Sequence, residues 1–560
     1  MPELELVGDD EASRKARGAF FTPPAIANFL ADWAVRDDAE ATVLDPTCGE
    51  SVFLLAAGRR LKKLGRSASQ MRRQIFGVDL HADSLKESKS LLKERGLDAT
   101  LLVSDFFDVQ SPAQLNCPLP LMDAVIGNPP FVRYQQHSGD VRRKSVAAAL
   151  AQGVRLNGMA SSWAALLVHA CGFLKPDGRL AMVVPAELLT VHYAEPIRRW
   201  LRARFAAVHL VMFDRLQFDD ALERVVLVVA RGSGGCDAFS LHYLNDAADL
   251  RNIHAFDNVS VTPADEGKWT DLLMPLSDRQ LFRTVVSRDF EPLRSYGTVE
   301  LGTVTGNNEF FMISDAEREV RGLTVDQVRP TCPPGSRHLK GTSFTLGNWE
   351  SLRDAGESVW MLHPAADDRS ASLKKYVRHG ESLGVDQAYK CQVRTPWWRP
   401  PVVSPPDLFF TYMSHRYPRL VTNSAGVTFA NSMHGVRLAK DAPRAAKFAL
   451  PLLALNSVTM LGAEVHGRSY GGGILKMEPR EAGQLPIPSP QALAAAWNLI
   501  QPEKPMLDRL LRKGHWVEVS KRVDEALLHE TLGLERCDVA RLHEAARALR
   551  QRRMGPSHTD

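Results

Sequence analysis

A run of four residues, Asn128-Pro129-Pro130-Phe131, combines one carboxamide, two rigid rings and one aromatic ring. It follows residues 124–126, an apolar run that predicts a buried strand. Neither proline can donate a hydrogen bond to a sheet, so the strand must end there in a rigid loop. Loops at the carboxyl ends of strands are the usual ligand sites of open α/β sheets. The four residues therefore predict a binding corner, with an ordinary Asn-Pro turn as the alternative.

The acceptors of this loop suit an exocyclic amine on a flat base. Such an amine is a poor nucleophile because its lone pair is delocalised into the ring. The Asn128 carboxamide oxygen and the Pro129 carbonyl could accept its two hydrogens and favour a tetrahedral nitrogen, most strongly in a dry, preorganised pocket. Phe131 could stack on the base, which contributes roughly 1–3 kcal/mol. These groups suit the transfer of a group to the amine nitrogen.

The stretch from Asp123 to Phe131 resembles the catalytic motif of amino methyltransferases that use S-adenosylmethionine, and it is most similar to that of the N6-adenine DNA methyltransferases. In that family the loop holds the extruded base and the acceptors for its amine. The resemblance implies that Asn128, Pro129, Pro130 and Phe131 are the catalytic residues. The N4 amine of cytosine stays open as a target, because the tetrapeptide alone does not exclude it.

A second motif lies between the apolar run 41–44 and the apolar helix that follows it. Strand, glycine-containing turn and helix form the ligand-binding corner of a doubly wound fold. The free N–H groups of the helix N-terminus would meet the carboxylate of the cofactor. The turn resembles the family's Asp-Pro-x-Cys-Gly-x-Gly pattern through Asp45, Cys48 and Gly49. It departs from that pattern at Ser51, where a Cβ restricts the backbone.

Two later apolar runs, each predicted to be a strand, lead to acids. The first ends at Asp79, whose carboxylate could accept hydrogens from both ribose hydroxyls, with Leu80 or His81 packed on the adenine. The second leads to Asp105 and Phe106. The resemblance implies that Asp105 accepts the N6 hydrogen of the cofactor's adenine and that Phe106 lies against the ring. Core packing is the alternative for Phe106.

The N-terminal part of the chain contains Phe21-Thr22-Pro23-Pro24, followed by an amphipathic segment. Thr22 is expected to cap the helix, with Pro23 at its first position. In the family a Phe-Thr-Pro sequence lines the methionine end of the cofactor. The resemblance therefore implies that Phe21, Thr22 and Pro23 contact S-adenosylmethionine.

The order of these motifs resembles the gamma arrangement, in which the cofactor, catalytic and target-recognition regions follow one another. The predicted fold is α/β, with a doubly wound, Rossmann-like class I methyltransferase core in residues 1–235. Because 560 residues are too many for one such domain, we expect a C-terminal DNA-recognition domain in residues 236–490. A helical C-terminal segment is expected in residues 491–560.

Candidate contacts with the DNA substrate lie on both sides of the predicted boundary. Phe218 matches a position that packs on the target base in relatives, with a core role as the alternative. Arg468, Tyr470 and Lys476 flank three glycines, which permit close backbone approach to a partner. A surface turn is the alternative for that segment. Residues 301–311 predict a strand, a turn at two asparagines and a second strand.

Composition excludes several classes of protein. None of the seven cysteines forms a Cys-x-x-Cys pair, so neither a metal site nor a disulfide scaffold is expected. No run of about 18 apolar residues occurs, so no membrane span is expected. The acidic N-terminus lacks the pattern of a signal peptide. We therefore expect a cytoplasmic protein, and the resemblance implies a bacterial one.

Basic residues crowd two stretches, although the formal net charge is only +4. Seven lie between residues 59 and 73, and four lie between residues 547 and 553. A solvated helix face is the favoured interpretation of the first cluster. Contact with DNA is the alternative.

The sequence as a whole predicts a site-specific DNA methyltransferase that acts on adenine N6 in a short duplex sequence. The resemblance further implies the modification half of a type II restriction system. Its partners would be double-stranded DNA and, functionally, a cognate restriction endonuclease. Methylation of adenine in ribosomal RNA, of protein glutamine or of cytosine N4 in DNA are alternative activities. A non-catalytic DNA specificity protein is a further alternative, which the intact Asp45, Asp79, Asp105 and Asn128 disfavour.

Overall fold

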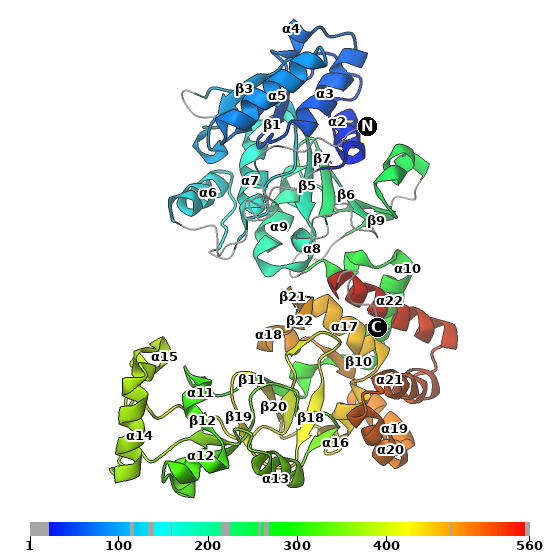
Figure 1. Ribbon diagram of the computed structural model, residues 1–560. Coiled ribbons are helices and arrows are strands. Elements are labelled where there is room, and N and C mark those ends of the chain that lie inside the picture. The colour runs from blue at the N-terminus through cyan, green and yellow to red at the C-terminus, as the bar shows by residue number, and fades with distance from the viewer. Residues whose placement is uncertain are drawn as a thin grey trace. The chain divides into compact units, whose positions relative to one another are not determined.

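The computed structural model falls into two compact units, Met1–Trp269 and Thr270–Asp560, whose helices and strands are labelled in Figure 1. The described residues are 22–112, 117–132, 139–157, 160–213, 225–255, 259–262, 268–470 and 473–554.

The first unit is built on a nine-stranded sheet with the strand order β3-β2-β1-β4-β5-β7-β6-β8-β9. Neighbours from β3 to β5 are parallel, whereas β7 runs antiparallel to both β5 and β6. The order reverses at β1, which lies between β2 and β4, and ligands bind at such switch points. The sheet confirms the predicted doubly wound α/β core. Its strands are β1 Val43–Asp45, β2 Ile75–Asp79, β3 Thr100–Val103, β4 Met122–Gly127, β5 Leu174–Pro185, β6 Ala207–Phe213, β7 Val225–Arg231, β8 Phe239–Leu244 and β9 Val259–Val261.

Helices pack on this sheet through stripes of apolar residues at helical spacing. In α2 (Pro24–Val35), Ile26, Leu30 and Ala34 are buried at intervals of four. Figure 1 shows α2, α3 and α5 grouped over the part of the sheet that contains β1 and β3. The other helices of the unit are α3 Val52–Lys63, α4 Ala68–Met71, α5 Ala82–Glu94, α6 Gly139–Ala151, α7 Ser162–Ala170, α8 Glu187–Thr190 and α9 Glu195–Arg204, with the 3₁₀ turns η1 Phe106–Asp108, η2 Cys171–Phe173, η3 His192–Ala194 and η4 Ala247–Ala255.

The first unit ends later than residue 235, where the sequence placed the end of the core. β8 pairs with β6, and β9 pairs with β8, so the sheet continues beyond that boundary. Trp269 is buried and also belongs to this unit. Its backbone N–H donates to the Leu189 carbonyl at 2.7 Å, and the Arg198 guanidinium lies 5.5 Å from its ring. The domain boundary therefore moves to Trp269.

The second unit begins with the 3₁₀ turn η5 (Thr270–Leu273) and contains short strands. Its described residues form sheets with the orders β11-β20-β16-β18-β14, β12-β15-β13-β19, β17-β22-β21 and β10-β23. The strands are β10 Phe290–Pro292, β11 Gly297–Leu301, β12 Met312–Ile313, β13 Val328–Cys332, β14 Ser343–Phe344, β15 Trp360–Leu362, β16 Leu408–Phe410, β17 Met413–Ser414, β18 Leu420–Asn423, β19 Thr428–Phe429, β20 His434–Leu438, β21 Arg468–Tyr470, β22 Ile474–Lys476 and β23 Pro486–Pro488.

The strand–turn–strand prediction for residues 301–311 is wrong in its second half. β11 ends at Leu301, and residues Asn308–Phe311 form the short helix α11. The side chain of Asn307 accepts from the Phe310 N–H at 3.0 Å, so this asparagine caps a helix rather than making a hairpin turn.

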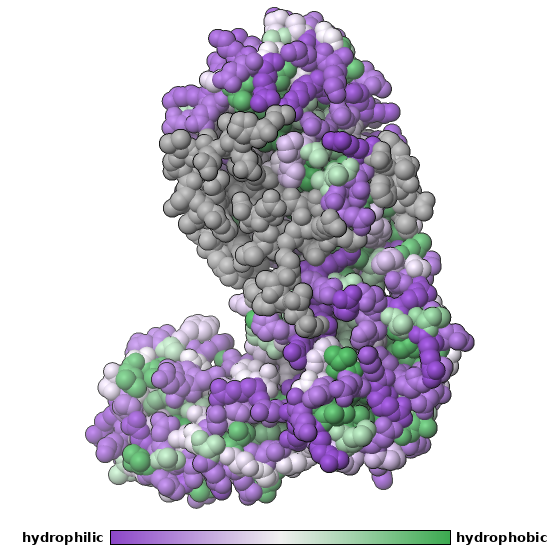
Figure 2. Space-filling view, turned by 45° about the vertical axis from the view of Figure 1, so that its right-hand side comes forward, coloured by the Kyte–Doolittle hydropathy of each residue, from purple (hydrophilic) through white to green (hydrophobic). Residues whose placement is uncertain are grey.

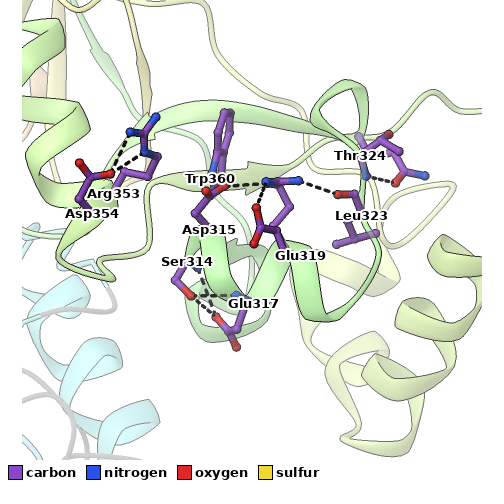
Figure 3. Close-up of polar contacts among 11 residues, drawn as sticks. Ser314, Asp315, Glu317, Glu319, Leu323, Thr324, Arg353, Asp354 and Trp360 are labelled. Atoms are coloured by element: carbon purple, nitrogen blue, oxygen red, sulfur yellow. Dashed lines mark hydrogen bonds and ion pairs between the residues drawn. The ribbon is translucent and has the colours of Figure 1, made fainter.

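A lobe of the second unit packs around an aromatic-rich core, and α12 (Asp315–Val320) lies at its surface with no buried residue. Figure 3 shows Ser314 and Glu317 close together at the start of α12, where they form a capping box. Asp315 accepts a hydrogen bond from the Trp360 indole N–H at 2.7 Å. The remaining helices before residue 400 are α10 Leu276–Asp289, α13 Leu346–Asp354, α14 Ala371–Ser382 and α15 Tyr389–Gln392, with the 3₁₀ turns η6 Leu293–Ser295, η7 Val325–Gln327 and η8 Val385–Gln387.

The described part of the chain after residue 490, which ends at Met554, is mostly helical and belongs to the second unit. Leu493, Trp516 and Leu542 lie in one apolar core with Leu408 and Val436 of the sheet. The segment expected at residues 491–560 therefore packs into the same core as the preceding strands. The helices from residue 446 onward are α16 Ala446–Leu453, α17 Ser457–His466, α18 Pro479–Ala482, α19 Pro490–Ile500, α20 Lys504–Arg512, α21 Trp516–Asp524 and α22 Arg536–Met554, with the 3₁₀ turn η9 Gln501–Glu503 and the π-helical turn η10 Glu525–Thr531 between them.

The described surface is mixed in character. Figure 2 shows small apolar patches separated by polar residues on the visible face of the second unit. Within the described ranges no single helix is long and apolar enough to cross a membrane, and only the bent pair α16–α17 passes a test of length and composition. No group of three histidine, cysteine or acidic side chains in those ranges could hold a metal ion.

Candidate active site

The carboxyl end of β4 carries the Asn-Pro-Pro loop. Asn128 follows the last residue of that strand, and its Nδ2 donates to Thr22 Oγ1 at 3.2 Å. Its Oδ1 is buried and has no hydrogen-bond partner among the described residues. The amide nitrogen is therefore held in place while the amide oxygen is left to accept.

Thr22 lies before α2 and does not cap it. The N-cap is Pro23 and the first helical residue is Pro24, which corrects the predicted cap at Thr22 and the predicted first position at Pro23. The reason is steric, because a residue that precedes proline is disfavoured in the helical conformation. The buried Thr22 hydroxyl instead accepts from Asn128. Phe21 lies outside the described residues.

Ser162, the first residue of α7, fixes the far side of the loop. Its hydroxyl donates to the Pro130 carbonyl, and it accepts from the Val132 N–H at 2.9 Å. Its own N–H donates to the Val132 carbonyl at 3.0 Å. No described residue donates to the Pro129 carbonyl. The loop is thus fastened at both ends, with Asn128 Oδ1 and the Pro129 carbonyl left without donors in this part of the chain.

Phe131 is only 9 % exposed. Its ring is therefore largely covered in the free protein, and stacking on a base stays a prediction.

Asp45 ends β1, next to the loop. Its Oδ1 accepts from the Thr47 N–H at 3.1 Å, whereas its Oδ2 is buried without a partner in the described ranges. Gly127 permits this approach, since a Cβ there would lie 2.9 Å from Asp45 Oδ1. Burial raises the pKa of Asp45 to about 8, with the Thr47 N–H opposing the rise and the Asp79 carboxylate adding to it. The site therefore holds a carboxyl that is easily neutralised.

Asp79 ties the end of β2 to the glycine turn. Its Oδ2 accepts from the Gly49 N–H at 3.0 Å, and its Oδ1 accepts from the His81 N–H at 2.8 Å. Each carboxylate oxygen retains a second lone pair for a ligand. Leu80 is 62 % exposed beside it, and its contact with a cofactor stays a prediction.

The turn after β1 has open space beside Gly49. Gly49 has φ +43°, and a Cβ at this position would meet no atom within 4 Å. Ser51, the N-cap of α3, has φ +65°, a left-handed conformation that favours glycine. Cys48 is buried, and burial raises the pKa of its thiol further than the nearby Asp45 does. Its sulfur is therefore a neutral, unreactive group.

Asp105 and Phe106 differ in what they could contact. Asp105 is half-buried and accepts from the Phe107 N–H at 3.0 Å, which caps η1. Phe106 is buried, with its ring 4.9 Å from that of His169 and 5.2 Å from that of Phe173. This packing favours the core interpretation of Phe106, and contact of either residue with a ligand stays a prediction.

Buried polar atoms without described partners gather at the ends of β1 and β4. Such atoms are rare in folded proteins and indicate a missing partner. The group comprises Asp45 Oδ2, Thr47 Oγ1, Ser51 Oγ and Asn128 Oδ1. With the open space at Gly49, they define a polar ligand corner at the switch point of the sheet.

Comparison with known proteins assigns this corner to a family. The family described as N-6 DNA Methylase matches residues 7–212. The family described as the C-terminal domain of the type II methyltransferase M.Eco57I matches residues 266–528. The chain is a type II DNA methyltransferase of the N-6 methylase family. The first match falls within the first structural unit, which places the candidate site in the methylase part, and the second match begins at the end of that unit and lies almost entirely in the second.

Relatives extend along most of this methyltransferase. It is 22 % identical over 480 residues to the type II methyltransferase M.AccI of Acinetobacter calcoaceticus, covering 84 % of each chain. It is 24 % identical over 487 residues to M.XamI of Xanthomonas campestris pv. amaranthicola, covering 85 % of this chain and 86 % of that one. Both units therefore have counterparts in single-chain methyltransferases.

A solved structure shares the fold of the methyltransferase. The type IIL restriction-modification enzyme MmeI, determined in complex with DNA, superposes with a TM-score of 0.54 at 12 % identity. The match covers 98 % of this chain and 80 % of that one. Both units therefore follow a known architecture.

The candidate DNA contacts of the second unit lie on the sheet β17-β22-β21. Tyr470 is 54 % exposed, and Lys476 Nζ lies 5.4 Å from its ring. Lys476 is also paired with Glu478 at 2.7 Å, and Arg468 Nε donates to the buried Glu481 at 2.6 Å. The structure brings the three predicted residues together, but it engages both cations in ion pairs. Phe218 lies outside the described residues.

Three residues of the site were missed by the sequence analysis. Thr47 contributes a buried hydroxyl, Gly127 gives Asp45 its room, and Ser162 fastens the loop. Gly127 had a signal, since a glycine that ends a buried strand marks a close backbone approach. The sequence around Ser162 predicted its role only weakly, because a serine before an apolar helix is ordinarily interpreted as a helix cap.

Proposed function

We propose that this methyltransferase transfers a methyl group from S-adenosylmethionine to adenine N6 within a short duplex DNA sequence. The observation that carries the proposal is the pair of acceptors at the end of β4. Asn128 Oδ1 and the Pro129 carbonyl are both without donors among the described residues, on a loop that Thr22 and Ser162 hold. An amine with two hydrogens matches two fixed acceptors.

The residues at the switch point fit the proposed cofactor. The free N–H groups at the start of α3 suit its carboxylate, and the unpartnered Asp45 Oδ2 suits its cationic amine. Asp79 retains lone pairs for ribose hydroxyls, and the exposed Leu80 offers an apolar surface to a base. Cys48 and Gly49 would line the same turn, with Pro23 near the loop and Asp105 further along the sheet. When bound, S-adenosylmethionine supplies a methyl group activated by its sulfonium.

The protein's own groups would act on the amine before and during transfer. Asn128 Oδ1 and the Pro129 carbonyl accept its hydrogens and stabilise the positive charge that develops on nitrogen. Thr22 keeps the Asn128 amide from rotating, so its oxygen needs no reorganisation. Phe131 would cover one face of the base and exclude water. No covalent bond between protein and DNA is needed.

Double-stranded DNA is the substrate that the second unit supports. Reaching a paired adenine requires extrusion of the nucleotide, which costs a few kcal/mol. DNA contacts elsewhere must offset that cost, and Arg468, Tyr470 and Lys476 are candidates. The matching families are of DNA methylases, which disfavours RNA as the substrate. In a bacterial cell, the modified sequence would be protected from a cognate restriction endonuclease.

Methylation-sensitive sequencing of DNA from bacteria that express the chain tests this function. We expect N6-methyladenine at one short motif, and none in cells that express Asn128→Ala. Modified cytosine N4 at that motif would replace the adenine assignment, because the same two acceptors suit that amine. Unmodified DNA in both cultures would refute the proposal, provided that the wild-type protein is folded and expressed.

A further inference from the structure

The first unit contains a second hollow that is separate from the loop at Asn128. A cavity of about 1350 Å³ lies among α2, α3, η4 and the strands β5 to β8. Arg179, which lines it, stands opposite Ala124 in the register of β4 and β5. Asn128 follows four residues later, or about 13 Å further along the strand. The cavity extends from Arg179 to Pro24 and Ala25 at the start of α2, and none of the residues assigned to the methylation site lines it.

One face of the sheet forms the floor of the cavity. Arg179 pairs with Arg231, and His209 pairs with Val229, in the register of β5, β7 and β6. On β7, Val229 and Arg231 are two residues apart, as are His209 and Val211 on β6. With Arg179, which pairs with Arg231, their side chains therefore share one face of the sheet. All five line the cavity. This face of the sheet lines the cavity, and it carries polar and basic side chains.

The cavity is strongly positive. Its lining includes two acids, Asp32 and Asp37, and both lie against Arg60, at 3.7 and 2.8 Å. The other basic residues of the lining form no ion pair with an acid of the described ranges. They are Arg36, Arg59, Lys62, Lys63, Arg179, Arg231 and Arg251. Burial lowers the pKa of Arg179, and the neighbouring Arg36 and Arg231 lower it further, whereas Asp38 and Asp123 oppose the shift.

Aromatic rings line the same cavity. Phe29 and Trp33 are four residues apart on α2, so they lie on one face of that helix. The opposite stripe of α2, with Ile26 and Leu30, is buried in the core. Both rings are half-buried, which distinguishes them from the core residues of the helix.

Two imidazoles add hydrogen-bonding groups to the floor. His209 Nδ1 lies 3.3 Å from His242 Nε2, with the rings stacked at 5.6 Å. Burial and the adjacent Arg231 lower the pKa of His209. An anion bound between Arg231 and His209 would relieve this crowding of positive charge.

We propose that the cavity binds a strand of nucleic acid, with phosphodiesters on its cations and unpaired bases on Phe29 and Trp33. Positively charged grooves with aromatic platforms bind single strands in this way. The cations come from α2, α3, the sheet and η4, so they match several phosphates rather than one. The volume also exceeds the 300–1,000 Å³ or so that is usual for a small-molecule site. This would be a second nucleic-acid-binding site, in addition to the site that binds the duplex with the target base.

Binding of a short oligothymidylate without any target sequence tests the proposal. The variant Arg59→Gln/Lys63→Gln/Arg231→Gln removes three exposed cavity cations, and Arg73→Gln/Lys89→Gln/Lys93→Gln removes three exposed cations elsewhere on the unit. We expect the first variant to lower affinity about tenfold or more at low salt, and to lower the slope of log affinity against log salt by about 2. The control variant should retain wild-type affinity. Equal effects of the two variants would overturn the proposal.

Photo-crosslinking locates the strand without reference to methylation. An oligothymidylate with 5-iodouracil should crosslink to the peptide that contains Phe29 and Trp33, and the yield should fall in Phe29→Leu/Trp33→Leu. Crosslinks confined to other peptides would overturn the assignment, including the case in which another segment of the chain occupies the cavity. A duplex of equal length is the second arm. If the cation variant weakens duplex and single strand equally while the leucine variant has no effect, the cavity holds duplex backbone and the proposed strand is refuted.

Discussion

At the scale of single residues, the candidate active site depends on which polar atoms are held and which are left unpaired. Thr22 and Ser162 fasten the catalytic loop from two distant parts of the chain. Asn128 Oδ1 and Asp45 Oδ2 stay buried without described partners. Leaving buried acceptors unpaired destabilises a folded protein by roughly 1–3 kcal/mol each. A bound cofactor and an extruded base would remove that penalty, so the free site is prepared for ligands.

Thr22 is expected to act by orienting Asn128. Thr22→Val preserves the shape of the side chain but removes the acceptor for Asn128 Nδ2, so the amide can rotate. Loss of one hydrogen bond of about 1 kcal/mol should lower kcat up to about tenfold. Thr22→Ser should restore the rate. Steady-state kinetics on duplex DNA, with the KM for cofactor measured in parallel, separate this role from cofactor binding. An effect on cofactor KM alone, or equal rates for the two variants, would contradict it.

The pKa of Asp45 predicts how stability depends on pH in the cofactor-free protein. Its folded pKa of about 8 lies above the ordinary value near 4, so the folded state holds the proton more tightly. The contribution of this group is fully present below about pH 4 and is lost as the pH rises toward 8. The melting temperature of the wild type should therefore fall by several degrees relative to Asp45→Asn between about pH 5 and pH 8. Parallel curves for the two proteins would show that Asp45 does not titrate in this window.

At the scale of elements, the turns that end strands set the geometry of the site. The turn between β1 and α3 holds Ser51 in a left-handed conformation that costs roughly 1–2 kcal/mol for a residue with a Cβ. The related family pattern has glycine at this position. Ser51 therefore adopts a conformation that suits glycine, although it carries a side chain.

Replacing Ser51 by glycine should stabilise the first unit. Ser51→Gly relieves the left-handed strain but frees the unfolded chain, so we expect a net gain of about 0.5–1 kcal/mol. Ser90→Gly, at an exposed position within α5, should instead lose about 0.5–1 kcal/mol. Thermal unfolding of both variants measures the difference. A loss of stability in Ser51→Gly would contradict this prediction, because the contacts of the Ser51 side chain would then stabilise the unit by more than the backbone strain destabilises it.

Arg553 on α22 joins the last helix to the hairpin that carries the candidate DNA contacts. It is paired with Glu464 at 2.8 Å with both side chains 6 % exposed, and it donates to the carbonyls of Gly473 and His415. Arg553→Ala leaves Glu464 buried and unpaired, so we expect a loss of about 3–5 kcal/mol in unfolding free energy. Arg536→Ala, which removes an exposed pair from the same helix, should lose less than about 1 kcal/mol. Similar losses in the two variants, measured by denaturant unfolding, would contradict this account.

At the scale of the whole molecule, each unit has its own core and its own boundary. β6 has β7 on one side and β8 on the other, so the large sheet is incomplete without residues 239–244. In the second unit, strands β16, β18 and β20 share one apolar core with the C-terminal helices, whereas β12, β13, β15 and β19 contribute to a separate core. The domain boundary therefore depends on strand pairing and shared cores, which extend past residue 235.

Truncation tests the boundary at Trp269. A chain of residues 1–235 exposes the apolar edge of β6, which unpaired strands use to aggregate. Residues 1–269 retain β8 and Trp269. We expect the longer fragment to be recovered soluble and to unfold cooperatively, and the shorter one to aggregate or unfold at lower temperature. Equal behaviour in circular dichroism melts would restore the earlier boundary.

Local patterns made much of the first unit predictable. Apolar runs of three or more residues marked β1 to β4, because buried parallel strands are apolar on both faces. β1, β2 and β4 are buried, whereas the edge strand β3 is partly exposed. The motifs at their ends followed, since a parallel sheet brings its carboxyl ends to one edge. Asn307 shows the limit, because an asparagine can cap a helix or make a turn, and only its packing partner decides. Phe106 shows another, because a ring suits a core and a ligand equally well.

The sequence by itself determined the chemistry of Asn128-Pro129-Pro130-Phe131, since its residue types and the strand before it are local properties. The tertiary structure decided what holds that loop, because Thr22 and Ser162 are brought to it only when the chain folds. It also decided that Arg179, Arg231, Phe29 and Trp33 share a cavity, since strand register and helix packing lie beyond any local pattern. Residue chemistry is encoded along the chain, whereas proximity is a consequence of folding.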